Sequence, residues 1–252
     1  MKSSDVTFAL VQCPAVKGRI DLNLQNHLKY VALAAANGAD IVIFPELSLT
    51  GYEPELASDL ALDTSADADP VIPLSEAAQT QGVIVVSGGP LQSDGTRPYI
   101  GALISYPSGI TELYRKQHLH PGESEYFIAG NESYVISYKG QQIALAICAD
   151  FCNPDHSAEA KAAGADAYLC SVLISENGFA PDSQLLQSRA RENVFPVLMT
   201  NYSGETGGWK SCGKSRVWSS DGEVIIASEG SENSMVLCTL SNGKVSGKIL
   251  DI

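Results

Sequence analysis

The feature that most constrains the fold of this chain is the repeated alternation of short apolar strands with amphipathic helices. Residues 6–13 form an apolar run typical of a strand, and residues 21–37 follow with apolar side chains at helical spacing. Asp21 is positioned to cap this helix and Gly38 to end it, before a short buried strand at residues 40–44. The alternation predicts an α/β fold, in which helices cover the faces of a sheet.

The alternation continues along the sequence, and no stretch rich in Pro, Gly or Ser separates one part from another. We therefore expect residues 1–252 to form a single domain. The further expected elements are a helix at 74–80, a strand at 83–89, a hairpin at 98–115, paired strands at 133–138 and 142–148, a helix at 182–194, a strand at 196–202, a glycine-rich loop at 204–215 and short strands at 215–219, 223–228 and 235–240.

Two segments of the chain resemble each other. Residues 34–48 (AAANGADIVIFPELS) and 160–175 (AKAAGADAYLCSVLIS) each contain the end of a helix, a Gly-Ala-Asp turn and an apolar strand. This similarity predicts two related layers, each a sheet covered by helices.

Composition argues against several classes of function. The chain of 252 residues is 44% apolar and 18% charged, as expected for a compact globular protein. Its 29 acidic and 16 basic residues give a net charge of −13 without a basic stripe, which argues against a nucleic-acid partner or an anionic membrane. The first residues lack the pattern of a signal peptide, and the six cysteines are expected to be reduced thiols, so we predict a cytoplasmic protein.

Three residues with reactive or charged side chains follow predicted strands. Glu46 follows residues 40–44, Lys116 follows the hairpin, and Cys148 ends the apolar run QIALAIC. Open α/β sheets place their binding sites at the ends of strands. A carboxylate, an ammonium and a thiol supplied in this way are therefore expected to converge on one pocket.

These groups together suit attack on a carbonyl or nitrile carbon. A free thiol is mostly protonated at neutral pH, and a nearby Glu carboxylate can remove its proton as a general base. A Lys ammonium favours the thiolate and stabilises an oxyanion, and the backbone N–H of Ala149 is a candidate second donor at the turn after the strand.

Other interpretations of the same residues remain open. Cys148 is also a good small core residue, while Glu46 and Lys116 are also consistent with a solvated loop and an exposed base. A cysteine–histidine pair with His118 or His156 as the base is a further alternative, and it leaves the glutamate and the lysine without a role.

A metal site is not expected from this sequence. His118 and His120 form an H-x-H pair without an obvious third ligand. Cys148 and Cys152 do not have the spacing of a zinc knuckle, and no second cysteine pair follows them.

Several segments resemble the nitrilase superfamily of carbon–nitrogen hydrolases. Three of them, FPELSLTGY (44–52), YRKQHLHPGESEYF (114–127) and ICADFCNP (147–154), are similar to its signature segments in their order and separation. SRARENVFPVLMTNYSG (188–204) and SSDGEVIIASEG (219–230) are also similar to parts of that superfamily, so the resemblance spans nearly the whole chain. It implies a four-layer α-β-β-α sandwich in the amidase/carbamoylase-like branch.

The resemblance implies a catalytic triad of Glu46, Lys116 and Cys148. It also implies a further glutamate after the lysine that supports the site, for which Glu123 fits best and Glu125 less well. The implied reaction cleaves a non-peptide C–N bond of a small amide or N-carbamoyl compound. The cysteine forms a thioester, ammonia or an amine leaves, and water releases the acid, with no metal or organic cofactor.

The sequence departs from the superfamily after the nucleophile. Asp150 matches, whereas the small Ala149 and the neutral Cys152 and Asn153 do not, and no Arg follows to bind a substrate carboxylate. We therefore expect a small neutral or amine-bearing amide as the substrate. The candidate pocket residues, chosen by their position in loops, are Tyr52, Tyr126, Asn177, Phe179 and Trp209.

Two other functions remain as alternatives on the same fold. A true nitrilase would use the same triad on a nitrile, and a non-catalytic binding protein would be expected to lack at least one triad residue, whereas all three are present. The resemblance further implies a homodimer or higher homo-oligomer, with the helix at 182–194 and the C-terminal strands as candidate interface elements.

Overall fold

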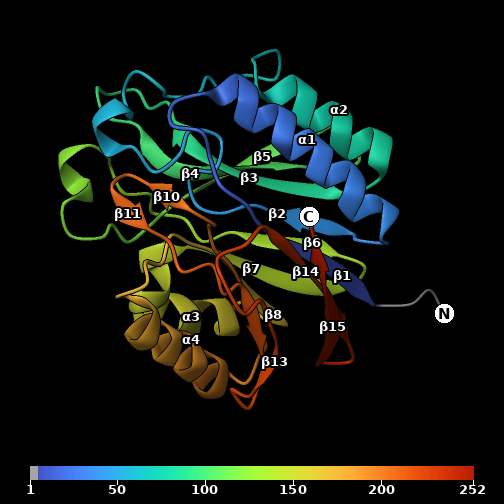
Figure 1. Cartoon of the computed structure of the whole chain (residues 1–252). Coiled ribbons are helices and arrows are strands. Elements are labelled where there is room, and N and C mark those ends of the chain that lie inside the picture. The colour runs from blue at the N-terminus through green and yellow to red at the C-terminus, as the bar shows by residue number, and fades with distance from the viewer. Residues whose placement is uncertain (1–4) are drawn as a thin grey trace.

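Two β-sheets pack face to face at the centre of the molecule in the computed structural model, which describes residues 5–252 (Figure 1). Helices α1 (Ile20–Ala36) and α2 (Val71–Gln81) cover the outer face of one sheet. Helices α3 (Pro154–Ala162) and α4 (Phe179–Asn193) cover the outer face of the other. The arrangement is the expected four-layer α-β-β-α sandwich.

The first sheet has seven strands in the order β15-β14-β1-β2-β3-β4-β5. Strands β1, β2 and β3 run parallel, and antiparallel strands flank them on both sides. The strands of this sheet are β1 (Val6–Gln12), β2 (Ile41–Ile43), β3 (Ile84–Leu91), β4 (Tyr99–Ser105), β5 (Thr111–Arg115), β14 (Ser234–Ser241) and β15 (Lys244–Asp251).

The second sheet has six strands in the order β13-β12-β9-β8-β7-β6, with β7, β8 and β9 parallel. A separate two-stranded ribbon and three short 3₁₀ helices lie in the loops. The elements are β6 (Val135–Tyr138), β7 (Gln141–Ile147), β8 (Ala167–Ser171), β9 (Val197–Thr200), β12 (Arg216–Trp218), β13 (Val224–Ala227), the ribbon strands β10 (Glu205–Thr206) and β11 (Trp209–Lys210), and the helices η1 (Pro54–Leu56), η2 (Glu123–Glu125) and η3 (Cys148–Cys152).

The two sheets repeat one pattern, as the two similar segments of the sequence predict. In the first half α1 precedes β2, which is the middle strand of its parallel set, and α2 follows it. In the second half α3 precedes β8, again the middle parallel strand, and α4 follows it. The strand ends of both halves therefore carry equivalent loops.

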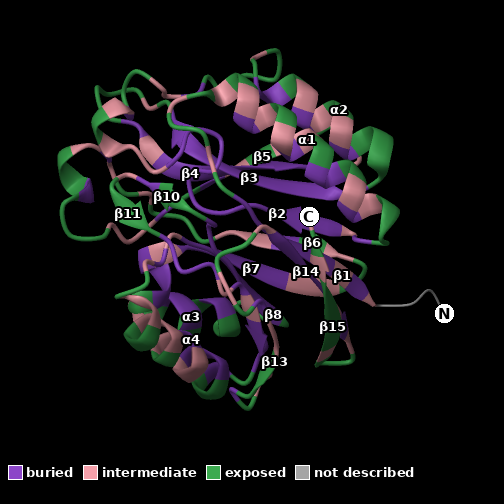
Figure 2. Ribbon diagram, viewed as in Figure 1, coloured by how far each residue is buried: buried purple, intermediate pink, exposed green. Residues whose placement is uncertain are grey.

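The apolar core has three parts, one for each interface between layers. Along β1, Phe8 and Leu10 contribute to the cluster between the two sheets, whereas Ala9 and Val11 contribute to the cluster under α1 and α2. A third cluster lies between the second sheet and its two helices. Figure 2 shows the central strands of both sheets buried and the helices exposed mainly on their outer faces, whereas the edge strand β15 is largely exposed. Burial on both faces explains why the central strands are continuous apolar runs.

Some local expectations were wrong. Asp21 does not cap α1: it lies in the first turn and accepts hydrogen bonds from the Arg19 side chain, and the residue at the N-cap position forms no side-chain cap. Helix α4 begins at Phe179, earlier than the expected residue 182. Strand β15 was not expected, because its largely exposed and charged residues do not form an apolar pattern.

Among residues 5–252, no helix combines the length and the apolar character that crossing a membrane would require.

Candidate active site

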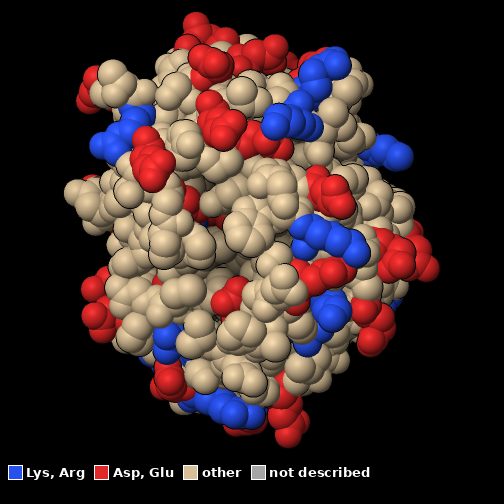
Figure 3. Space-filling model, turned by 60° about the vertical axis from the view of Figure 1, so that its left-hand side comes forward, with Lys and Arg blue, Asp and Glu red and all other residues tan. Residues whose placement is uncertain are grey.

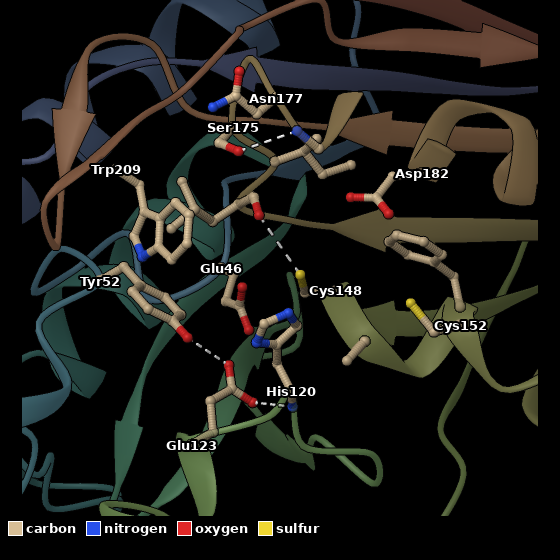
Figure 4. A pocket seen from close by; sticks show the side chains of 15 residues that line it. Glu46, Tyr52, His120, Glu123, Cys148, Cys152, Ser175, Asn177, Asp182 and Trp209 are labelled. Atoms are coloured by element: carbon tan, nitrogen blue, oxygen red, sulfur yellow. Dashed lines mark hydrogen bonds between the residues drawn. The ribbon is translucent and has the colours of Figure 1, made fainter. Parts of the chain in front are cut away.

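The three residues predicted to be catalytic do come from three strand ends. Glu46 lies in the turn after β2, Lys116 directly follows β5, and Cys148 directly follows β7. Glu46 and Lys116 are fully buried, and Cys148 is partly buried. The carboxylate of Glu46 and the thiol of Cys148 line one cavity of about 380 Å³ (Figure 4).

Lys116 holds two carboxylates behind this cavity. Its ammonium donates to Glu46 Oε1 at 2.7 Å and to both oxygens of Glu123 at 2.9 Å. Glu123 also accepts from the Tyr52 hydroxyl at 2.8 Å and from the His120 backbone N–H at 2.7 Å. The second oxygen of Glu46, Oε2, is buried and has no hydrogen-bond partner among residues 5–252. One lone-pair site of a positioned carboxylate is therefore free at the cavity.

Burial and neighbouring charges set the protonation of this cluster. Burial raises the pKa of Glu46 to about 7; the Lys116 ammonium lowers this pKa and the Glu123 carboxylate raises it. Burial opposes the charge of Lys116, but the acidic groups around it more than compensate, so its pKa is raised. Burial and Glu46 together raise the pKa of Cys148, against the effect of Lys116. The Cys148 thiol is therefore protonated at neutral pH.

The turn that carries the thiol is held in an unusual backbone conformation. Cys148 has a φ of 42°, in the left-handed region that residues with a side chain rarely adopt. Its Sγ lies 3.7 Å from the carbonyl oxygen of Leu173, which accepts from the thiol. The Asp150 carboxylate, fully buried, accepts from the Ile147 N–H at 2.9 Å and closes the turn. Such strain is typical of functional sites, where surrounding contacts maintain it.

Asp150 also connects this turn to the segment that carries the lysine. Its Oδ1 accepts from the backbone N–H groups of Gln117 at 3.0 Å and His118 at 2.8 Å. Its Oδ2 accepts from the Tyr114 hydroxyl at 2.6 Å. One carboxylate therefore fixes the turn that carries Cys148 relative to the end of β5.

The two histidines considered as bases have other partners. His118 contacts Asp150 through Nδ1 at 3.2 Å and Asn153 through Nε2 at 2.6 Å. His156 is buried, with its ring nitrogens bonded to the hydroxyls of Tyr114 and Tyr168. Neither imidazole lines the cavity that holds the thiol. The structure therefore does not support a cysteine–histidine pair.

Three of the five predicted pocket residues, Tyr52, Asn177 and Trp209, line this cavity, and Ala149 lines it as well. Tyr126 and Phe179 do not line it. Tyr126 borders a different hollow and Phe179 begins α4, where its ring packs against two basic side chains from the loop before β12 and from β12 itself.

Sequence reasoning missed more than half of the cavity wall. Several missed residues follow β8, at the position equivalent to the end of β2, so the similarity between the two halves of the chain was a usable signal. Others carry no local pattern that distinguishes them. The missed residues are His120, Phe151, Cys152, Leu173, Ile174, Ser175, Gly178 and Asp182.

Among residues 5–252, the structure contains no group of three or more His, Cys, Asp or Glu side chains arranged to hold a metal ion.

A cysteine and a buried carboxylate with one free oxygen in the same cavity are an arrangement suited to a cysteine nucleophile and its base. The family model for carbon–nitrogen hydrolases matches residues 7–244, and the chain belongs to this family. The chain is 30% identical over 237 residues to the "hydrolase in pqqF 5'region" of Pseudomonas protegens, covering 92% of this chain and 81% of the relative. It is 29% identical over 218 residues to a nitrilase of Pyrococcus abyssi, covering 84% and 81%.

A solved structure of similar fold adds a chemical comparison. A mutant of the amidase from Nesterenkonia sp. AN1 matches with a TM-score of 0.85 at 25% identity, over 96% of this chain and 92% of that chain. The acetamide moiety of fluoroacetamide is covalently attached to the active-site cysteine of that amidase, which is described as a member of the nitrilase superfamily. The resemblance to this superfamily is confirmed.

Proposed function

We propose that the protein hydrolyses the C–N bond of a small amide or N-carbamoyl compound through a thioester on Cys148. The observation that carries this proposal is that the two oxygens of the Glu46 carboxylate have different surroundings. Glu46 Oε1 is held by Lys116 at 2.7 Å, while Oε2 is unpaired beside the cavity that contains the thiol. A carboxylate positioned in this way, with its pKa near neutrality, suits proton transfer in both directions.

In the first half of the reaction the Cys148 sulfur attacks the carbonyl carbon and its proton passes to Glu46. The oxyanion that forms is stabilised by the backbone N–H of Ala149 on the cavity wall and by the charge of Lys116. Lys116 acts mainly through its charge, because its protons are directed to Glu46 and Glu123. As the C–N bond breaks, Glu46 returns the proton to the leaving nitrogen, and a thioester remains.

In the second half a water molecule attacks the thioester and gives a proton to Glu46. The carbon–sulfur bond then breaks, Glu46 protonates the sulfur of Cys148, and the carboxylic acid leaves. Each proton that Glu46 accepts is returned, so the cycle requires only water and the amide. Glu123 holds Lys116 in place, and its own position is fixed by the Tyr52 hydroxyl at 2.8 Å.

Ammonia release from a panel of amides, N-carbamoyl compounds and nitriles tests this function. We expect release from amides or N-carbamoyl compounds and its loss in a Cys148→Ala variant. Cys152 lines the same cavity, so Cys152→Ala is the matched control and is expected to retain release. Turnover of nitriles alone would favour a nitrilase. No turnover of any compound, with no acyl adduct on Cys148 by intact mass, would favour a binding protein.

We also propose that the protein is a homodimer in a reducing, cytoplasmic environment. The end of α4 and strand β13 present exposed apolar side chains, of Val194, Val224 and Ile225. The cysteines at positions 13, 148, 152, 170, 212 and 238 are free thiols. Light scattering at several concentrations tests the dimer, and replacing Val194 and Val224 by Lys is expected to dissociate it.

A further inference from the structure

The charges on the wall of the cavity are mostly negative. Glu46, Glu123 and Asp182 line it, and no Lys or Arg side chain among residues 5–252 does so. Lys116 lies behind the wall and is already bonded to the first two carboxylates. Among the acidic groups of the cavity, Asp182 is therefore the one without a Lys or Arg partner among residues 5–252.

The Asp182 side chain is placed to meet a ligand. It projects from the first turn of α4, and Figure 4 shows its carboxylate directed into the cavity, on the side opposite Trp209 and with Cys148 between them. Within residues 5–252, its oxygens form no hydrogen bond and no ion pair, although the side chain is partly buried. Burial raises the pKa of Asp182, and only His120 opposes this effect. Among residues 5–252, His120 is the group that partly offsets the charge of this carboxylate, and no Lys or Arg side chain does so.

The surroundings of the cavity favour a cation over an anion. The face that carries β10 and β11 is hollowed, and Figure 3 shows acidic atoms in and beside the hollow. The chain carries a net charge of −13, which attracts cations and repels anions at longer range.

We propose that Asp182 binds a positively charged nitrogen of the substrate, so that the enzyme acts on amides that also carry a protonated amine. This inference rests on the proposed function, because it assumes that the scissile amide lies at Cys148. An acid in the first turn of a helix also stabilises that helix through its dipole. That role alone would not require the carboxylate to face the cavity.

Matched substrates test the proposal. Each ω-amino amide in a series of graded chain length is paired with the alkyl amide in which a methyl group replaces the ammonium, for example 4-aminobutanamide with pentanamide. We expect kcat/KM to be about tenfold or more higher for the better-placed amino amides, as for a hydrogen-bonded charge pair. 4-Carbamoylbutanoate, which carries a carboxylate instead, is expected to be the poorest substrate.

Asp182→Asn keeps the shape of the side chain and removes its charge. We expect this variant to reduce the preference for amino amides over alkyl amides to near one. Asp251→Asn, on the exposed edge strand β15, makes the same change in net charge far from the cavity and is expected to keep the wild-type preference. A wild-type enzyme without a preference for amino amides, or a preference that Asp182→Asn leaves unchanged, would overturn the proposal.

A binding measurement separates this inference from the proposed function. Calorimetry with Cys148→Ala protein compares 4-aminobutanamide with pentanamide, with and without Asp182→Asn. One outcome is that the amine binds more tightly and that this depends on Asp182, while the wild-type protein hydrolyses no amide. This outcome would support the cation site and refute the hydrolase. Hydrolysis of amides with equal binding of the two probes would support the hydrolase and refute the cation site.

Discussion

The Nζ atom of Lys116 lies 2.7 Å from Oε1 of Glu46, and neither side chain is exposed to solvent. The same ammonium lies 2.9 Å from Glu123, so one buried cation is shared by two buried carboxylates. The shared charge does not fully stabilise both carboxylates, and burial leaves the pKa of Glu46 raised to about 7. This relationship places beside the cavity a carboxyl group whose pKa lies near neutrality.

The first prediction concerns the reactivity of Cys148 as a function of pH. Because the thiol has a raised pKa and transfers its proton to Glu46, we expect its alkylation by iodoacetamide to accelerate as pH rises through about 7. Glu46→Gln removes the acceptor and is expected to move this rise to higher pH and to lower kcat by about 10²–10⁴-fold. Peptide mapping by mass spectrometry follows Cys148 separately from Cys152.

Glu55→Gln is the control for this experiment, since Glu55 is an exposed acid of η1 outside the cavity. Its pH profile is expected to match that of the wild type. An unchanged alkylation profile in Glu46→Gln would show that the thiol does not depend on this carboxylate.

The second prediction concerns stability and pH. The pKa of Glu46 is raised from 4.5 to about 7, so between these values the folded protein binds a proton that the unfolded chain releases. This contribution to the free energy of unfolding is complete below about pH 4.5 and is lost as pH rises to about 7. Urea unfolding across this range is expected to show a steeper loss of stability with pH for the wild type than for Glu46→Gln. Equal slopes would contradict the raised pKa.

The third prediction concerns the buried charge of Lys116. Lys116→Met removes the cation and leaves two buried carboxylates close together, so we expect a loss of about 3–5 kcal/mol in the free energy of unfolding. Adding Glu123→Gln removes one of the two uncompensated charges and should recover part of this loss. If the double variant is less stable than Lys116→Met, the charge balance inferred here is wrong. Thermal and urea unfolding measure both variants.

The positions of these charged residues could be predicted from sequence because they depend on local pattern. Glu46, Lys116 and Cys148 each follow an apolar strand, and the sandwich brings those strand ends together. Such a pattern requires no knowledge of side-chain contacts. The predicted layers were correct for the same reason, since alternation of strands and helices determines which faces must be buried.

The wall of the cavity could not be predicted in this way. Phe179 was assigned to the pocket as a loop residue, but it begins α4, and its ring lies 4.5 Å from the Arg216 guanidinium. Asp182 was assigned to a helix and not to the pocket, although it is the residue of that helix that faces the cavity. The direction of a side chain at a helix start depends on where the helix docks, which is a tertiary property.

The fourth prediction concerns Asp150, which accepts hydrogen bonds from four residues on both sides of the site. Asp150→Asn keeps the shape of the side chain but replaces one oxygen by an amide N–H₂, which cannot accept. In one orientation this group faces the backbone N–H groups of Gln117 and His118. In the other it faces the Ile147 N–H and the Tyr114 hydroxyl. We expect a loss of about 1–3 kcal/mol for each buried donor left unpaired. Tyr114→Phe removes one of the bonds to Asp150, together with the bond between this hydroxyl and His156, and should cost less. A milder effect of Asp150→Asn would contradict this role.

The fifth prediction concerns the backbone support of Glu46. Gly88 on β3 lies so close to the turn that a Cβ at this position would meet Leu47 N at 2.5 Å and Pro45 O at 2.8 Å. Both contacts are with backbone, so Gly88→Ala must displace the turn that carries Glu46. A displacement near 1 Å is expected to lower kcat by about 10²-fold. Gly95→Ala, whose Cβ would meet only Ser93 Oγ at 3.6 Å, is the matched control.

The temperature dependence distinguishes displacement from simple destabilisation in the Gly88→Ala variant. A protein that is only less stable would regain wild-type kcat at temperatures well below its unfolding transition, where nearly all molecules are folded. A protein with a displaced Glu46 keeps its low kcat there, and its Cys148 alkylation also loses the rise with pH near 7. Recovery of wild-type kcat at low temperature would show that the β3 backbone does not position the base.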